Sequence, residues 1–364
     1  MKSRYWVGAT LALMGSVACA QSVTIYGVLD VAVEHLNKVG ASGDSLTRVP
    51  SFTGTVPSRL GFRGVEDLGG GLRAGFTLES GLMLDTGGLN QGGRMFGRQA
   101  FVNLSGAWGS VMLGRQYTML FHGLAGADIL GPNIYSSSSL DSYIPNARAD
   151  NAIGYMGSFS GVTVGATYST GRDTVNAANP GGTNCAGENA SDKKACREWS
   201  ALLKYDAPAW GVALAADELR GGTGALGLGS SALTDRRISL NGYAKVGGAK
   251  IGAGLLSRDN EGNALTPRSD LWYVGASYPV TPKVTVDGQV FRLKYKDSAN
   301  KALLVALRGT YALSKRTAVY ATAGNIDNSG TLTGSVSGGA AGPLSATKAG
   351  GSQLGVAAGV RHSF

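Results

Sequence analysis

The feature that most constrains the fold is a two-residue alternation of apolar with polar or small side chains, which is clearest in residues 353–364. Leu354, Val356, Ala358, Val360, His362 and Phe364 share one face of an extended chain, and Gln353, Gly355, Ala357, Gly359, Arg361 and Ser363 share the other. A period of two indicates a β-strand, and about ten residues is the length that a tilted strand needs to cross a bilayer. A half-buried edge strand of a soluble sandwich would show the same pattern, so the rest of the chain must decide.

The chain opens with the pattern of a secretory signal. Two basic residues and an apolar run to Val17 are followed by Ala18-Cys19-Ala20, a small-residue cleavage site. The pattern predicts a signal peptide over residues 1–20 and a mature chain over 21–364. A lipid anchor on Cys19 is the alternative, although Ser16 stands where such a signal carries a large aliphatic residue.

Composition narrows the class of the mature chain. No later stretch holds about 18 consecutive apolar residues, so no transmembrane helix is expected. The chain has 57 glycines and 10 prolines, and only 16% of its residues are charged. Its apolar residues are spread through short alternating segments, which favours a barrel between lipid and water. Removing Lys2 and Arg4 from the formal charge of +9 leaves +7, which we interpret as an anion-attracting lumen rather than a nucleic-acid surface.

Sixteen alternating segments follow the signal. They cover residues 23–36, 57–65, 72–81, 97–105, 110–116, 150–158, 162–169, 199–205, 212–218, 236–246, 250–257, 270–278, 284–294, 303–313, 317–324 and 353–364. Short turns join them on one side and longer polar loops on the other, which is the layout of an outer-membrane barrel. An even strand number lets the first and last strands pair, so every backbone group in lipid is satisfied. The predicted fold is an all-β, 16-stranded antiparallel transmembrane β-barrel.

Two smaller patterns accompany the strands. Aromatic residues fall near strand ends, as interfacial girdles require: Trp108, Phe159, Trp199, Tyr205, Trp210, Tyr278, Tyr311 and Phe364. Cys185 and Cys196 are the only cysteines left after cleavage, and they lie in one polar loop of a secreted chain. We therefore expect a loop disulfide and no metal site, since no histidine or third cysteine is nearby.

Several stretches resemble the general diffusion porins of Gram-negative outer membranes. They are Ser22-Val23-Thr24-Ile25-Tyr26-Gly27, Ser58-Arg59-Leu60-Gly61-Phe62-Arg63-Gly64, Glu66-Asp67-Leu68-Gly69-Gly70-Gly71-Leu72, Phe96-Gly97-Arg98-Gln99-Ala100-Phe101-Val102, Leu113-Gly114-Arg115-Gln116 and Gly359-Val360-Arg361-His362-Ser363-Phe364. They keep the family's order along nearly the whole mature chain.

The resemblance implies a homotrimer that lets small hydrophilic solutes and inorganic ions diffuse passively, without a cofactor. It implies that the third long loop, residues 117–147, folds into the lumen and narrows it. It also implies outer-membrane lipid and lipopolysaccharide as surroundings, and recognition of Phe364 by the barrel assembly machinery.

The constriction residues follow from the same resemblance. Arg59, Arg98 and Arg148 match the family's basic cluster, Glu79 matches its inner carboxylate, and Asp128 matches its loop acid. Alternation places Arg59, Arg148 and Glu79 inward. Alternation does not place Arg98 inward, because Arg98 shares the parity of outward residues. It needs a bulge or a rim position to turn inward. With a second loop acid replaced near Gly131-Pro132, the arginines should favour anions.

Three other functions would each require features of their own. An outer-membrane enzyme needs a nucleophile and a base, but no such motif surrounds His35, His122 or His362. A plugged transporter needs a large N-terminal plug, and the first strand starts directly after the signal. A solute-specific channel is the serious alternative, with Tyr135 and Tyr143 of the long loop as the only hint of an aromatic path.

Overall fold

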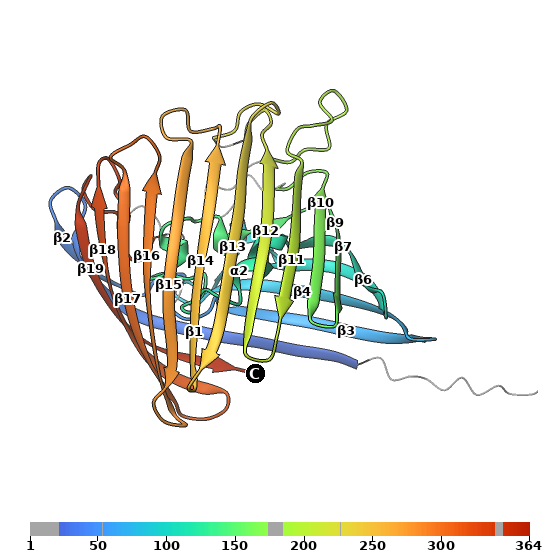
Figure 1. Cartoon of the computed structure of the whole chain (residues 1–364), viewed down its shortest axis with the longest axis horizontal. Helices are drawn as coiled ribbons and strands as arrows, with labels where there is room; N and C mark the ends of the chain where they lie inside the picture. The colour runs from blue at the N-terminus through green and yellow to red at the C-terminus, as the bar shows by residue number, and fades with distance from the viewer. Residues whose placement is uncertain (1–21, 53, 174–184, 226, 339–344) are drawn as a thin grey trace, which may run out of the picture.

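The computed structural model describes residues 22–52, 54–173, 185–225, 227–338 and 345–364, so the predicted signal peptide lies outside the described residues. A closed antiparallel barrel of sixteen strands dominates it (Figure 1). The wall consists of β1 (Ser22–Val39), β3 (Arg59–Gly69), β4 (Leu72–Met83), β6 (Gln99–Gly106), β7 (Gly109–Tyr117), β9 (Ala152–Phe159), β10 (Val162–Ser169), β11 (Glu198–Asp206), β12 (Trp210–Arg220), β13 (Thr234–Val246), β14 (Ala249–Asn260), β15 (Arg268–Pro279), β16 (Val284–Tyr295), β17 (Lys301–Ala312), β18 (Thr317–Ser329) and β19 (Ser352–Ser363). The predicted fold class and strand number are confirmed.

The first and last strands close the barrel. β1 pairs with β3 through residues 22–28 and with β19 through residues 28–36. Gly27 marks the change of partner, and it exchanges two backbone hydrogen bonds of 3.1 Å with Phe364. The closed ladder leaves no edge strand, which a wall in contact with lipid requires.

The expected alternation holds along the wall. On β1 the side chains of Val31 and Val33 are exposed outward, whereas Asp30 and Glu34, which flank them, are fully buried. All eight aromatic residues expected near strand ends are exposed on the outer surface: Trp108, Phe159, Trp199, Tyr205, Trp210, Tyr278, Tyr311 and Phe364.

Several strands run beyond their predicted ends on the long-loop side, because the ladder continues above the apolar band. β18 was expected to end at residue 324 and ends at Ser329. The loops also contain short elements that alternation does not reveal: β2 (Asp44–Arg48), β5 (Gly88–Leu89), α1 (Asn90–Gly93) and β8 (Arg148–Ala149). Within the described ranges, none of the helices has the length and apolar character of a membrane span. A disulfide joins Cys185 to Cys196, with a Cα–Cα distance of 5.2 Å.

The segment after β7 enters the barrel, as expected for residues 117–147. It contains α2 (Met119–Leu124), η1 (Ser137–Ser139) and η2 (Ile144–Asn146), and Figure 1 shows α2 inside the ring of strands. We call residues 117–147 the lumen loop. Its backbone hydrogen-bonds to the wall: Leu130 N donates to Gln289 Oε1 at 2.8 Å, and Met119 N donates to Ser200 Oγ at 2.8 Å.

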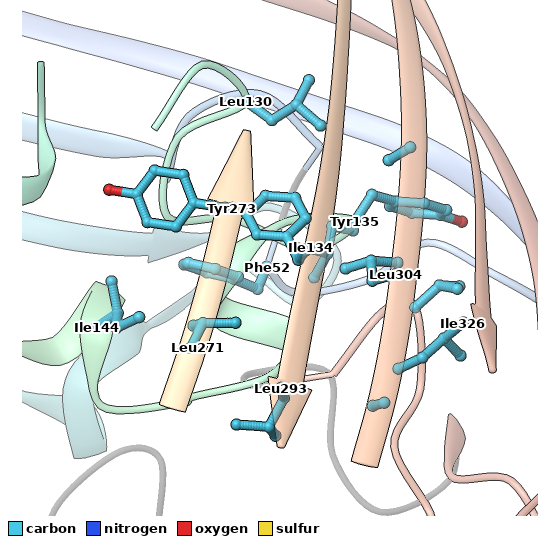
Figure 2. Close-up of a cluster of buried hydrophobic side chains, with 14 of the residues drawn as sticks. Phe52, Leu130, Ile134, Tyr135, Ile144, Leu271, Tyr273, Leu293, Leu304 and Ile326 are labelled. Carbon is cyan, nitrogen blue, oxygen red and sulfur yellow. The ribbon is translucent and has the colours of Figure 1, made fainter. Parts of the chain in front are cut away.

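The lumen loop is held by an apolar core inside the barrel. Leu130, Ile134, Tyr135 and Ile144 of the loop meet inward side chains of the wall, among them Leu271, Tyr273, Leu293, Leu304 and Ile326 (Figure 2). A barrel between lipid and water would have water along its inner face. The structure differs at β14–β18, because the loop covers that face and excludes water from it.

Candidate pore constriction

One carboxylate connects two of the predicted arginines. Glu79 lies near the end of β4, where its Oε1 accepts a hydrogen bond of 2.7 Å from Arg98 Nε. Its Oε2 lies 3.5 Å from Arg59 Nε and accepts a 3.0 Å hydrogen bond from the Tyr26 hydroxyl. Glu79 and Arg98 are about 4% exposed, whereas the Arg59 side chain is 30% exposed. Arg59 is therefore the member of this group most open to solution.

A tyrosine extends the group to the third arginine. The Tyr117 hydroxyl accepts hydrogen bonds from Arg98 Nη2 at 2.5 Å and from Arg148 Nη2 at 2.8 Å. The Arg148 guanidinium also lies over the Tyr117 ring, 4.4 Å from its centroid, in a cation–π contact. Burial keeps these interactions stronger than they would be in water. Arg59, Glu79, Arg98, Tyr117 and Arg148 thus form one continuous chain of contacts, which we call the arginine cluster.

Arg98 can point inward because it precedes the strand whose alternation would turn it outward. β6 begins at Gln99, so Arg98 lies just outside the strand and does not follow its alternation. Its backbone N–H donates to Glu79 O at 3.0 Å, which places its side chain beside the Glu79 carboxylate. Arg148 also lies outside a wall strand, in the short β8, which pairs with the end of β7 at Gln116 and Tyr117.

The two predicted acids lie in different parts of the barrel. Glu79 is inward, on the wall that carries the arginines, between Arg59 and Arg98. Asp128 is buried within the lumen loop, where its carboxylate accepts hydrogen bonds from Ser137 at 2.6 Å and Ser136 at 3.3 Å. Burial raises the pKa of Asp128, although these hydroxyls act to lower it. The structure does not bring Asp128 together with the arginine cluster.

A second polar group holds the lumen loop against β11–β13. Asp141 of the loop forms a bidentate ion pair with Arg237 of β13, and Arg237 lies 4.4 Å from the Tyr143 ring centroid. The Tyr143 hydroxyl contacts Glu198 at 2.9 Å and Asp217 at 2.8 Å. This group was not among the predicted site residues. Alternation indicates that Asp217 and Arg237 point inward, but nothing local in the sequence indicates their partners in the loop.

The described part of the chain has no group of three or more metal-ligating side chains. The arginine cluster instead offers guanidinium donors. Arg148 is 5% exposed, and its Nε and Nη1 find no hydrogen-bond partner among the described residues. Guanidinium groups donate to negative oxygen or halide and offer no acceptor to a cation, and Arg59, with 30% of its side chain exposed, is the member of the cluster that a passing anion can reach.

Comparison with known proteins agrees with this architecture. The model of the Gram-negative porin family matches residues 8–331. The chain is 32% identical to outer membrane porin protein 32 of Delftia acidovorans over the full length of both, and 30% identical to an outer membrane porin protein of Bordetella pertussis, covering 88% of this chain and 93% of that one. A solved structure, described as the anion-selective porin from Comamonas acidovorans, superposes with a TM-score of 0.76 at 29% identity, covering 94% of this chain and all of that one. The chain therefore belongs to the Gram-negative porin family and is an outer-membrane porin.

Proposed function

We propose that this porin conducts small anions in preference to cations, and that the arginine cluster sets the preference. The observation that carries the proposal is the charge balance of the cluster: it holds three guanidinium groups and one carboxylate, Glu79, which pairs with Arg59 and Arg98. A net positive wall raises the local concentration of anions and repels cations in a narrow water-filled path. The description of the Comamonas acidovorans porin as anion-selective supports the same reading.

The alternative of a solute-specific channel has less support. Tyr135 and Tyr143 were the only hint of an aromatic path, but Tyr135 is 1% exposed inside the apolar core. Tyr143 directs its hydroxyl to Glu198 and Asp217 and its ring to Arg237. Both tyrosines therefore serve to hold the lumen loop, which favours diffusion selected by charge and diameter.

The test is the reversal potential across a planar bilayer in a KCl gradient. The wild type should give discrete conductance steps and a reversal potential toward that of chloride. Arg59→Gln should move it toward zero, because it removes the most solvent-accessible charge of the cluster. Arg292→Gln is the control, since Arg292 is exposed on the outward parity of β16. Cation preference in the wild type would overturn the proposed polarity.

We also propose that the chain assembles as a homotrimer in outer-membrane lipid and lipopolysaccharide. One compared structure, of OmpT from Vibrio cholerae, is described as a trimer form. Native mass spectrometry in detergent should give a mass of three chains, and a stable monomer would contradict the proposal.

Phe364 is proposed as the signal read by the barrel assembly machinery. Its exposed ring at the end of the last strand supports this role. Phe364→Ala should lower the amount of folded barrel in cells while leaving refolding into detergent intact. Equal losses in both would indicate a purely structural role.

Finally, we propose that the porin has no enzymatic activity. His35 Nδ1 contacts Thr47 Oγ1 and His362 Nδ1 contacts Thr317 Oγ1, whereas His122 lies edge-on to the Phe121 ring. The three imidazoles thus have separate structural neighbours. Measurable hydrolysis of phospholipid or casein by purified protein would contradict this proposal.

A further inference from the structure

A polar cavity of about 580 Å³ opens on the short-turn side of the barrel, beside β16–β19. In outer-membrane barrels this side faces the periplasm. Its lining includes five cationic residues: Arg59, Lys283, Lys315, Arg316 and Arg361. No aspartate or glutamate lines it among the described residues. We call this cavity the basic vestibule.

The cations come from four separate segments. Lys283 belongs to the turn between β15 and β16, and Lys315 and Arg316 belong to the turn between β17 and β18. Arg361 is on the inward parity of β19, opposite Ala318 of β18 and Asp30 of β1. Arg59 connects the vestibule to the arginine cluster. Chain segments far apart in sequence thus direct like charges toward one space.

Arg59 pairs with Glu79 at 3.5 Å, and Asp30, opposite Arg361, directs its carboxylate to Thr55, Val56 and Tyr320. Among the described residues, no salt bridge within 4.0 Å involves Lys283, Lys315, Arg316 or Arg361. The carboxyl terminus lies at the edge of the vestibule, where Phe364 O accepts the Gly27 N–H at 3.1 Å. Gathered cations raise each other's energy, and a bound anion would relieve that repulsion.

The remaining lining suits an anion as well. Thr285 and Thr310 lie opposite each other on β16 and β17, on the inward face, and both line the vestibule. Hydroxyl donors beside ammonium and guanidinium groups are the chemistry that binds carboxylate and phosphate oxygens. A monovalent ion would leave most of this charge uncompensated, so the arrangement fits an anion with several charges.

We propose that the basic vestibule is a binding site for a compact polyvalent anion, of the class of pyrophosphate or a tricarboxylate. The inference rests on the anion preference proposed above, and it adds a site distinct from the constriction. An anion held there occupies the path between the periplasm and Arg59. Bound polyvalent anion therefore reduces the chloride current.

The experiment uses the wild-type porin in a planar bilayer in symmetric KCl, with pyrophosphate as the probe. Pyrophosphate should block the current in a saturable manner. The triple variant Lys283→Gln/Lys315→Gln/Arg316→Gln changes exposed turn residues and should raise the half-blocking concentration at least about tenfold, because three charge-assisted contacts are lost. Its reversal potential in a KCl gradient should still favour chloride, since Arg59, Arg98 and Arg148 are retained.

The matched control removes the same net charge from the opposite part of the short-turn rim. Lys204→Gln/Lys245→Gln/Lys250→Gln alters β11, β13 and β14, and should change the half-blocking concentration less than about twofold. An equal effect in both triple variants would overturn the site, because it would mean that the total positive charge of the rim, and not the basic vestibule, causes the block. Absence of block in an anion-preferring wild type would overturn the site and leave the proposed function standing. Block by an acidic peptide but not by pyrophosphate would assign the surface to a protein partner instead.

Discussion

Asp141 and Arg237 form a buried bidentate ion pair between the lumen loop and β13. Arg237 Nε donates to Asp141 Oδ2 at 2.8 Å, and Nη2 donates to Oδ1 at 3.2 Å. Arg237 is 1% exposed and also contacts Asp235 at 3.0 Å. The pair ties the lumen loop to the wall beside the apolar core, to which Ile144 of the same part of the loop belongs.

Asp141→Asn should therefore loosen the lumen loop. Removing one partner of a buried pair costs about 3–5 kcal/mol of stability. We expect a loss near the lower end, because Arg237 still contacts the Asp235 carboxylate. Urea unfolding in lipid vesicles measures the free energy, and single-channel recordings should show greater current noise. Asp297→Asn is the control, because Asp297 is 84% exposed in its pair with Arg268 and should change stability little. Equal stability losses in both variants would contradict the assigned role.

The same pair predicts a dependence on acid. Burial disfavours the charged Asp141 carboxylate, but Arg237 and Arg258 outweigh burial and lower its pKa to about 2. An unfolded aspartate titrates near pH 3.9, so the pair contributes fully above about pH 4, and its contribution is lost as pH falls through about 2. The stability difference between the wild type and Asp141→Asn should shrink over that interval. A difference that persists unchanged at pH 2 would exclude this account.

Gly27→Ala should weaken barrel closure. A Cβ at Gly27 would lie 2.7 Å from Arg59 O, and it would overlap the Phe364 ring. Backbone cannot move aside as a flexible side chain can, so we expect a loss of about 1–3 kcal/mol. Gly309→Ala is the control, because nothing lies within 4 Å of its added Cβ. Heat-dependent gel migration should show unfolding at a lower temperature for Gly27→Ala but not for Gly309→Ala. Unchanged migration would contradict the close approach of Arg59 O and the Phe364 ring to Gly27.

Glu79→Gln should strengthen anion preference. The change removes the carboxylate that Arg59 and Arg98 share, while the amide keeps its volume. The reversal potential in a KCl gradient should move further toward that of chloride. Asp327→Asn on the outer face of β18 serves as control. A shift toward cations, or the same shift in both variants, would show that the arginine cluster does not set the ion preference.

Tyr117→Phe should destabilise the arginine cluster without removing charge. The hydroxyl accepts from both Arg98 and Arg148, and its loss leaves two buried guanidinium groups with a donor unsatisfied. The expected cost is about 1–3 kcal/mol by urea unfolding. Tyr155→Phe should cost less, since its hydroxyl bond to Trp108 O is exposed. Unaltered stability of Tyr117→Phe would mean that solvent replaces the hydroxyl.

The sequence by itself determined the barrel. Alternation with a period of two decides which face of each strand meets lipid, because a shift of one residue would turn every side chain to the wrong side. It therefore predicted the inward position of Glu79, and the same alternation separates Val31 and Val33 outside from Asp30 and Glu34 inside.

Only the tertiary structure decided where the lumen loop lies and what its residues touch. The loop has no periodicity, so nothing local places Asp141 beside Arg237 or Ile134 beside Leu304. Asp128 shows the limit of matching a residue to a family position: its role depends on which neighbours surround it, and here Ser136 and Ser137 enclose it. Contacts between distant segments form only when the barrel closes, and the lumen is defined by those contacts.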